Sequence, residues 1–142
     1  MSHISDRLLS SAEHIGEMPS GALLLKDNAH YPWFMIVPDG GDFVEWIDLP
    51  AGLQEKMQAD INTLSKFLLE DPELKVGKTN VAAIGNIVPQ FHLHIIGRIE
   101  DDPAWPAPVW GHPDSREYEA GELEALVARL DQAVAEFTIR QL

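Results

Sequence analysis

The chain has 142 residues, and 23 Asp or Glu against 10 Lys or Arg give it a formal net charge of −13. This length predicts a single domain over residues 1–142, and a hydrophobic fraction of 45% predicts a globular fold rather than disorder. The charge argues against binding of nucleic acid, because the far field of the protein repels a phosphate backbone. A local pocket of hydrogen-bond donors can still capture a small phosphate ligand.

The absence of cysteine excludes a thiol nucleophile, disulfides and thiolate zinc sites. The sequence also has no apolar run as long as a signal peptide core or a membrane span. We therefore expect a cytoplasmic protein that has no membrane partner.

The first third of the chain predicts short elements. Residues 4–17 are expected to form an N-terminal helix, and the apolar runs 22–26 and 33–37 are expected to form strands. Residues 43–47 suggest another short strand or the end of a strand. Polar and glycine-containing turns separate these segments.

The rest of the chain predicts two helices and two strands. Apolar residues recur at spacings of three and four over 49–70, which indicates an amphipathic helix with Asp48 as its N-cap. Strands are expected over 79–84 and 90–99, and a C-terminal helix over 119–141. This order predicts an α+β fold, with a mainly antiparallel sheet of about five strands, one long central helix and the C-terminal helix.

The segment 85–98 carries most of the chemical information. Side chains alternate between the two faces of a strand, so one face here is apolar and the other presents a polar row that is expected to face a cleft. The apolar residues are Phe91, Leu93 and Ile95, and the polar residues are Gln90, His92 and His94. Two histidines on one face can also be inert surface groups, or ligands of a zinc ion with His30 or His112 as the third ligand.

Residues 90–96, Gln-Phe-His-Leu-His-Ile-Ile, resemble the signature of the histidine triad (HIT) superfamily, which reads His-φ-His-φ-His-φ-φ with φ apolar. Gly85 lies five residues before the first position of the signature, as in many members, and 27–38 resembles the nucleotide-binding strand pair of the family. Trp105-Pro106 also stands where several members have Trp-Pro. The resemblance covers about residues 20–110.

This resemblance implies a HIT-like fold, a homodimer, and hydrolysis or transfer of a nucleotide at its α-phosphate. His92 occupies the middle position of the signature and is then the nucleophile that forms a nucleotidyl-histidine. His94 is expected to stabilise phosphate oxygens, when protonated, or to assist the leaving group. Gln90 replaces the first histidine and is expected to orient His92 through hydrogen bonds. Substrates of this kind include dinucleoside polyphosphates and adenylate phosphoramidates.

The resemblance also implies a nucleotide-binding set. Asp27 or Asn28 is expected at the ribose, and Asn80 matches an asparagine of the preceding strand. The residues expected beside the phosphate are Gly85, Asn86 and Ile87. No cofactor is required by this chemistry, and a divalent cation can accompany a polyphosphate substrate.

Two other functions are consistent with the sequence. A nucleotide-binding protein with weak or no turnover is favoured by Gln90 and by Ile87, which stands where many relatives have a hydroxyl group. A zinc protein with histidine ligands is the second alternative.

Arg98 and three tryptophans near the motif are not assigned to the catalytic or nucleotide-binding set. Arg98, the only basic residue close to the signature in sequence, is expected on the same face as the histidines, either paired with Glu100 or Asp101 or in contact with a distal phosphate. Trp33 is expected in the core. Trp105 and Trp110 lie in the proline-rich loop 101–113 and either close over the site or pack against the helices.

Overall fold

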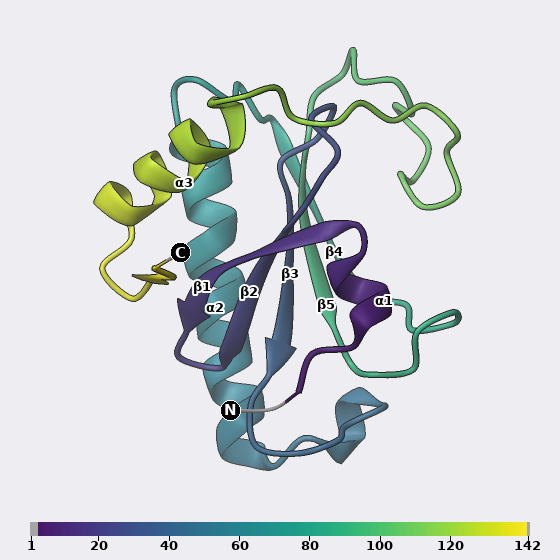
Figure 1. The fold of residues 1–142 in the computed structure, drawn as a ribbon, viewed down its shortest axis with the longest axis vertical. Coiled ribbons are helices and arrows are strands. Elements are labelled where there is room, and N and C mark those ends of the chain that lie inside the picture. The colour runs from purple at the N-terminus through teal and green to yellow at the C-terminus, as the bar shows by residue number, and fades with distance from the viewer. Residues whose placement is uncertain (1–2, 142) are drawn as a thin grey trace.

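The computed structural model describes residues 3–141, and these form one antiparallel sheet with helices on both of its faces (Figure 1). The sheet has six strands in the order β4-β5-β3-β2-β1-β6, and all of its pairs are antiparallel. The strands are β1 (Ala12–Met18), β2 (Gly21–Lys26), β3 (Trp33–Pro38), β4 (Lys78–Ala83), β5 (Leu93–Arg98) and β6 (Thr138–Ile139). The helices are α1 (Asp6–Leu9), α2 (Ala51–Glu70), α3 (Glu122–Ala133) and the short 3₁₀ helix η1 (Trp46–Asp48). The predicted α+β fold is thereby confirmed.

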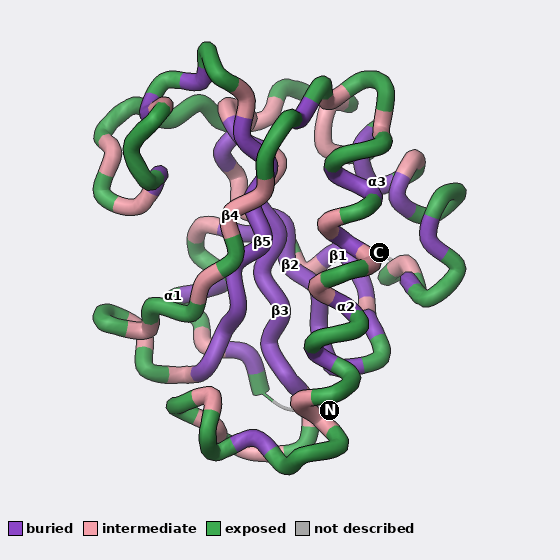
Figure 2. The backbone as a smooth tube through the Cα atoms, turned by 180° about the vertical axis from the view of Figure 1, so that it is seen from behind, coloured by how far each residue is buried: buried purple, intermediate pink, exposed green. Residues whose placement is uncertain are grey.

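The two faces of the sheet bury separate apolar clusters. Helices α2 and α3 cover one face, where Leu64 of α2 and Leu130 of α3 join inward residues such as Phe34 and Ile95. The other face lies under α1 and the loop that follows β5 (Figure 1). The central strands are buried along most of their length (Figure 2). Complete burial of one leucine stabilises such a core by about 1.5–3 kcal/mol.

Several predicted elements are confirmed, with small changes at their ends. The predicted strands 22–26, 33–37 and 79–84 correspond to β2, β3 and β4, and the long helix corresponds to α2. The predicted N-cap is wrong, because α2 begins after Pro50 and Asp48 belongs to η1. The Asp48 carboxylate instead accepts a hydrogen bond from the backbone N–H of Glu45 at 2.9 Å.

Three predicted elements are wrong in part or in full. The N-terminal helix ends at Leu9, and the chain continues as β1 rather than as helix. Residues 43–47 form no strand. The C-terminal helix ends at Ala133, after which Thr138 and Ile139 pair with β1 as strand β6.

The close contact between β1 and β6 depends on a glycine. A Cβ atom at Gly16 would lie 2.2 Å from the carbonyl oxygen of Thr138, so a side chain there would separate the two strands.

None of the helices within residues 3–141 is sufficiently long and apolar to cross a membrane.

Candidate functional site

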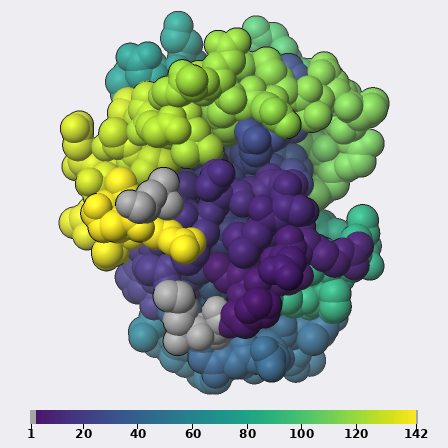
Figure 3. All heavy atoms as spheres, in the orientation of Figure 1, coloured from purple at the N-terminus to yellow at the C-terminus, as the bar shows by residue number. Residues whose placement is uncertain are grey.

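A cavity of about 420 Å³ opens on the α1 face of the sheet and contains both histidines of the signature. Its walls come from α1, β2, β3, β5, the loop after β4 and the loop after β5. Figure 3 shows this face, with the N-terminal segment (purple) between the loop after β5 above it and the segment after β4 at its side. The lining residues are Arg7, Leu8, Ser11, Lys26, Trp33, Met35, residues 84–88, His92, His94, Trp110 and Gly111.

His92 precedes β5, and its ring is fixed by a backbone group. Its Nδ1 atom lies 2.7 Å from the carbonyl oxygen of Gln90. A carbonyl oxygen only accepts, so Nδ1 carries the proton and Nε2 is left with its lone pair. Burial lowers the pKa of His92 below its ordinary value, although the bond to Gln90 opposes this, and the charge of Lys26 lowers it further. His92 is therefore a neutral imidazole with a free Nε2 at neutral pH.

His94 has the opposite tautomer, because the indole Nε1–H of Trp33 donates to its Nδ1 at 2.9 Å. Burial, together with His92 and Lys26 nearby, lowers the pKa of His94 to about 3. The role that required a protonated His94 is therefore corrected: the ring is neutral, and Nε2 carries its hydrogen. The two histidine rings lie 4.9 Å apart, centroid to centroid.

The cavity is positively charged although the protein is strongly negative. Lys26 and Arg7 line it, and no carboxylate of the described residues is among its lining groups. The Lys26 ammonium donates to the Ser11 hydroxyl at 3.1 Å and lies 5.3 Å from the centre of the Trp33 ring. Burial lowers the pKa of Lys26. Arg98, the basic residue closest to the signature in sequence, is not among the residues that line this cavity.

The loop after β4 brings the predicted phosphate-binding residues to His92. Gly85, Asn86 and Ile87 all line the cavity. Gly85 has φ +66°, a left-handed conformation that glycine adopts without the steric cost of a side chain. The structure thus places three of the six predicted nucleotide-binding residues beside both histidines.

Gln90 lies next to this cavity, but its side chain does not contact His92. Its Nε2 donates to the carbonyl oxygen of His3 at 2.5 Å, and its Oε1 accepts from the N–H of Ser5 at 2.8 Å. The expectation that the Gln90 side chain orients His92 is therefore corrected, because the backbone carbonyl of Gln90 orients that ring.

The other predicted nucleotide-binding residues lie outside the cavity. The Asp27 carboxylate accepts from the N–H of Tyr118 at 2.9 Å, and the Asn28 side chain accepts from the N–H of His30 at 3.2 Å. Asn80 accepts from Arg98 at 2.9 Å. These side chains connect segments of the fold, and none of the three lines the cavity.

Arg98 is buried and forms its ion pair with Asp102, not with Glu100 or Asp101. Its guanidinium donates to both oxygens of the Asp102 carboxylate, at 2.7 and 3.0 Å, and to the carbonyl oxygen of Ala107 at 2.9 Å. Its charged group also lies 5.5 Å from the ring centre of Trp105. Arg98 therefore organises the loop after β5 rather than contacting a ligand in this cavity.

The two tryptophans of that loop have different positions. Trp105 stacks against Arg98, whereas Trp110 lines the cavity and meets the His94 ring edge-on, with 5.3 Å between ring centres. Trp33, which was expected only as a core residue, also contacts His94 directly. Trp110 therefore takes the first of its two expected positions, at the site, whereas Trp33, Lys26 and Arg7 are site residues that the sequence did not indicate.

The described residues provide no complete set of ligands for a zinc ion bound by His92 and His94. Over residues 3–141, no three histidine, aspartate or glutamate side chains form a group that could hold a metal ion. His30, one of the predicted third ligands, lies 3.0 Å from the Asp114 carboxylate instead.

Comparison with known proteins agrees with this geometry. Residues 9–101 match the family model of the HIT domain, so the chain belongs to the HIT family. It is similar to the crystal structure of a histidine triad protein from Bradyrhizobium japonicum, with 37% identity over 93% of this chain and 97% of that one, at a TM-score of 0.87. No match was found among curated proteins.

Two further crystal structures of histidine triad proteins are similar. The one from Sinorhizobium meliloti 1021 has 30% identity, a TM-score of 0.87, and coverage of 93% of this chain and 96% of that one. The one from Marinobacter aquaeolei VT8 has 33% identity, a TM-score of 0.89, and coverage of 97% and 99%. Membership of this family supports, in general terms, an enzyme of the nucleotide hydrolase or transferase type.

Proposed function

We propose that this protein hydrolyses or transfers a nucleotide at its α-phosphate, with His92 as the nucleophile. The observation that carries the proposal is the hydrogen bond from His92 Nδ1 to the Gln90 carbonyl oxygen. That bond leaves Nε2 unprotonated in a cavity whose charged groups are both cationic. A neutral imidazole nitrogen beside bound phosphate is the arrangement that covalent catalysis by histidine needs.

The reaction would proceed in two displacements at phosphorus. The lone pair of His92 Nε2 attacks the α-phosphorus, a bond between nitrogen and phosphorus forms, and the bond to the leaving group breaks with its electron pair. The leaving group takes up a proton from solvent. Water, or the hydroxyl group of another acceptor, then attacks the same phosphorus and releases its proton to solvent, and the electron pair of the nitrogen–phosphorus bond returns to Nε2. The Gln90 carbonyl stabilises the positive ring of the intermediate by accepting from Nδ1–H.

The remaining lining groups would stabilise the phosphate oxygens. Lys26 supplies a positive charge, the neutral His94 supplies its Nε2–H, and Asn86 supplies an amide. Donors aimed at charge that develops in the transition state are a major source of rate enhancement. A dinucleoside polyphosphate or an adenylate phosphoramidate fits this chemistry, and a divalent cation can accompany the polyphosphate.

The test is mononucleotide release from a panel of adenylated and guanylated substrates. We expect release by the wild type and none by His92→Ala at the same protein concentration. His30→Ala is the matched control, because His30 lies outside the cavity lining, and it should release product like the wild type.

Binding without turnover is the second candidate. It is favoured by one observation, which is that the side chain at the first signature position contacts the N-terminal segment rather than His92. Nucleotide binding by the wild type without release from any substrate of the panel would support this candidate and overturn the hydrolase proposal.

A further inference from the structure

The side chain of Gln90 joins two distant parts of the chain. It donates to the carbonyl oxygen of His3 and accepts from the N–H of Ser5, and these residues lie more than eighty positions away in sequence. The nitrogen and the oxygen of the side-chain amide each make one of these bonds, so the N-terminal segment is held in one place at the edge of the site. We call this pair of hydrogen bonds the Gln90 clasp.

The clasp fixes the helix that follows it. Ile4 and Leu8 are buried in the apolar cluster of this face of the sheet, so α1 is held by packing as well as by the clasp. Arg7, between them, is exposed, and its Nη1 donates to the carbonyl oxygen of Ile87 at 3.3 Å. This long hydrogen bond connects α1 to the loop that carries Gly85 and Asn86.

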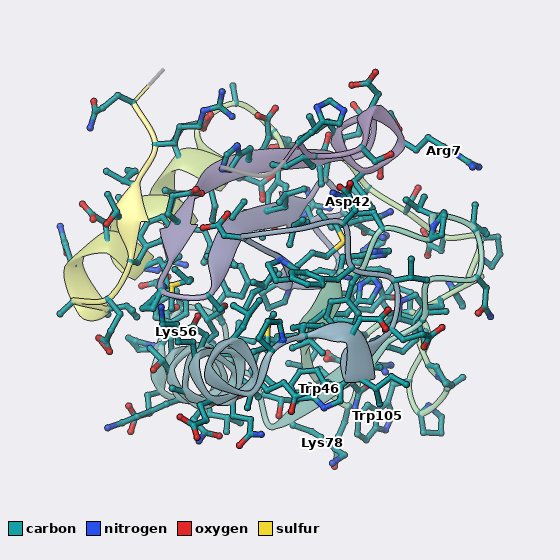
Figure 4. The ribbon with its side chains drawn as sticks, turned by 90° about the horizontal axis from the view of Figure 1, so that it is seen from below. Arg7, Asp42, Trp46, Lys56, Lys78 and Trp105 are labelled. Atoms are coloured by element: carbon teal, nitrogen blue, oxygen red, sulfur yellow. The ribbon has the colours of Figure 1, made fainter. Side chains whose placement is uncertain are left out.

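Arg7 thereby reaches the rim of the cavity that contains His92. It extends outward from α1 at the edge of the molecule (Figure 4). It lines the His92 cavity and also a neighbouring groove of about 560 Å³, whose walls include Gln90, Asp6 and Asp42. Its hydrogen bond to Ile87 uses one guanidinium N–H and leaves others for a ligand. Lys26 is deeper and half-buried, so the two cations lie at different depths.

We propose that Arg7 binds the phosphates beyond the α-phosphate, and that Gln90 is the positioning residue that keeps Arg7 at the rim. This inference rests on the function proposed above and narrows its substrate to nucleotides with two or more phosphates. A guanidinium suits the purpose because it donates to two phosphate oxygens at once. Gln90 then acts on substrate binding, through α1, and not on the nucleophile.

The first experiment measures nucleotide affinity in the His92→Ala background, with AMP, ADP and ATP as probes in the presence of a chelator. The parent should bind more tightly with each added phosphate. Arg7→Ala should weaken ATP binding about tenfold, as expected for loss of one charge-assisted hydrogen bond, and should change AMP binding less than twofold. Arg116→Ala removes an exposed arginine outside the cavity and should leave the whole series unchanged.

The second experiment tests the clasp with Gln90→Asn in the active enzyme. The shorter amide cannot reach both His3 and Ser5, but the backbone carbonyl that orients His92 is kept. We expect KM for the polyphosphate substrate to rise severalfold, while kcat and the midpoint of its pH profile stay unchanged. A lower kcat or a shifted midpoint, with KM unchanged, would show that Gln90 acts on His92 and would overturn the inference.

The outcomes separate the two proposals. A parent protein that binds none of the three nucleotides contradicts the proposed function itself. Two results contradict only the role of Arg7. One is a parent that binds AMP, ADP and ATP with equal affinity, and the other is an Arg7→Ala variant whose affinity still increases with each added phosphate. Arg7→Lys provides a check on charge, and it should retain part of that gain.

Discussion

His92 and His94 are two residues apart, yet their hydrogen-bond partners give them opposite tautomers. A backbone acceptor keeps the proton on Nδ1 of His92, and an indole donor keeps it away from Nδ1 of His94. One ring is thereby left with a free Nε2 and the other with an Nε2–H. The same pair of residues thus provides a nucleophile and a neutral donor.

The pH dependence of activity follows from the depressed pKa of His92. An ordinary histidine, with a pKa of about 6.5, is half-protonated at that pH and half-inactive as a nucleophile. Because burial lowers the pKa of His92, it loses its proton at a lower pH and stays neutral there. We expect kcat/KM to hold as pH falls through 6.5 and to decline only at more acidic pH. An acid limb with its midpoint at or above 6.5 would contradict this assignment.

Trp33→Phe tests the donor that sets the tautomer of His94. The substitution keeps an aromatic ring but removes the N–H and leaves His94 Nδ1 without its partner. Loss of one buried hydrogen bond corresponds to about 1–1.5 kcal/mol, so kcat should fall about tenfold. Nitrogen NMR of the imidazole should show a mixture of His94 tautomers. An unchanged kcat with a single His94 tautomer would refute this role for Trp33.

Lys26→Met tests the deeper cation. Methionine preserves most of the apolar stem and removes the charge, so AMP should bind about tenfold more weakly, as measured by calorimetry. As pH rises, the Lys26 ammonium loses its proton and its attraction for phosphate. Since burial lowers the pKa of Lys26, this loss of AMP affinity in the wild type should begin at a pH below the ordinary lysine value of 10.5. Lys78→Met, at an exposed position of β4, is the control. Equal AMP affinity in both variants would exclude Lys26 from the phosphate site.

At the scale of elements, the alternation along residues 90–96 predicted much of the site. It places Phe91, Leu93 and Ile95 in the cluster under α2, and it places His92 and His94 on the opposite side, although β5 itself begins only at Leu93. The resemblance also predicted the approach of Gly85–Ile87. Both signals are local in sequence, because strand alternation and a short loop do not depend on distant partners.

The cations and tryptophans of the site depend on pairing between distant strands. Met35 of β3 pairs with His94, so Trp33 of β3 reaches the site through the pairing of β3 with β5. Lys26 also needs the pairing of β2 with β3, in which Leu24 lies opposite Met35. In the arrangement proposed above, Arg7 also depends on the Gln90 clasp for its position at the rim of the cavity. The apolar spacing of residues 4–17 predicts a helix where β1 lies for a similar reason: the pairing of this strand with β2 and β6 determines its structure, and its own apolar spacing does not.

The buried pair Arg98–Asp102 holds the loop that delivers Trp110. Burial raises the pKa of the Asp102 carboxyl, but the hydrogen bonds and charge of Arg98 and the N–H groups of Trp105 and Ile99 outweigh it, so the net shift is downward. A carboxyl with a depressed pKa stabilises the fold above its unfolded value of about 3.9 and loses that contribution as pH falls through the folded value.

Asp102→Asn should therefore destabilise the fold substantially. Removal of one partner of a buried ion pair typically costs about 3–5 kcal/mol, because the remaining charge stays buried. Urea unfolding at pH 7 measures the change, and Glu100→Gln at an exposed position is the control. If Asp102→Asn unfolds at the same urea concentration as the wild type, the pair does not hold this loop.

At the scale of the molecule, nucleotide binding depends more on where the charges lie than on the net charge. A protein with a net charge of −13 repels a nucleotide at long range, whereas the cavity lining presents only positive charges. Salt screens the long-range repulsion within about 8–10 Å at physiological concentrations. Close contacts with Lys26 and Arg7 can then decide binding.

The homodimer implied by the family resemblance remains a prediction. Its support is the free edge of β4, which pairs only with β5 within the described sheet, and the exposed side chains of Val81 and Ile84 at that edge. Light scattering should give twice the chain mass of 15.8 kDa. Val81→Lys should lower that mass, because a charge at a strand edge disfavours pairing. A wild-type monomer at micromolar concentration would contradict this prediction.

The central claim is that His92 attacks phosphorus, and the stereochemistry of the reaction tests it most directly. A substrate with a chiral α-phosphorothioate, chosen from the best member of the panel, is hydrolysed in oxygen-18 water and the configuration of the product is determined. Each in-line displacement inverts phosphorus, so two displacements through a nucleotidyl-histidine should give overall retention. Inversion would mean that water attacks the substrate directly, and it would contradict the role of His92 as the nucleophile.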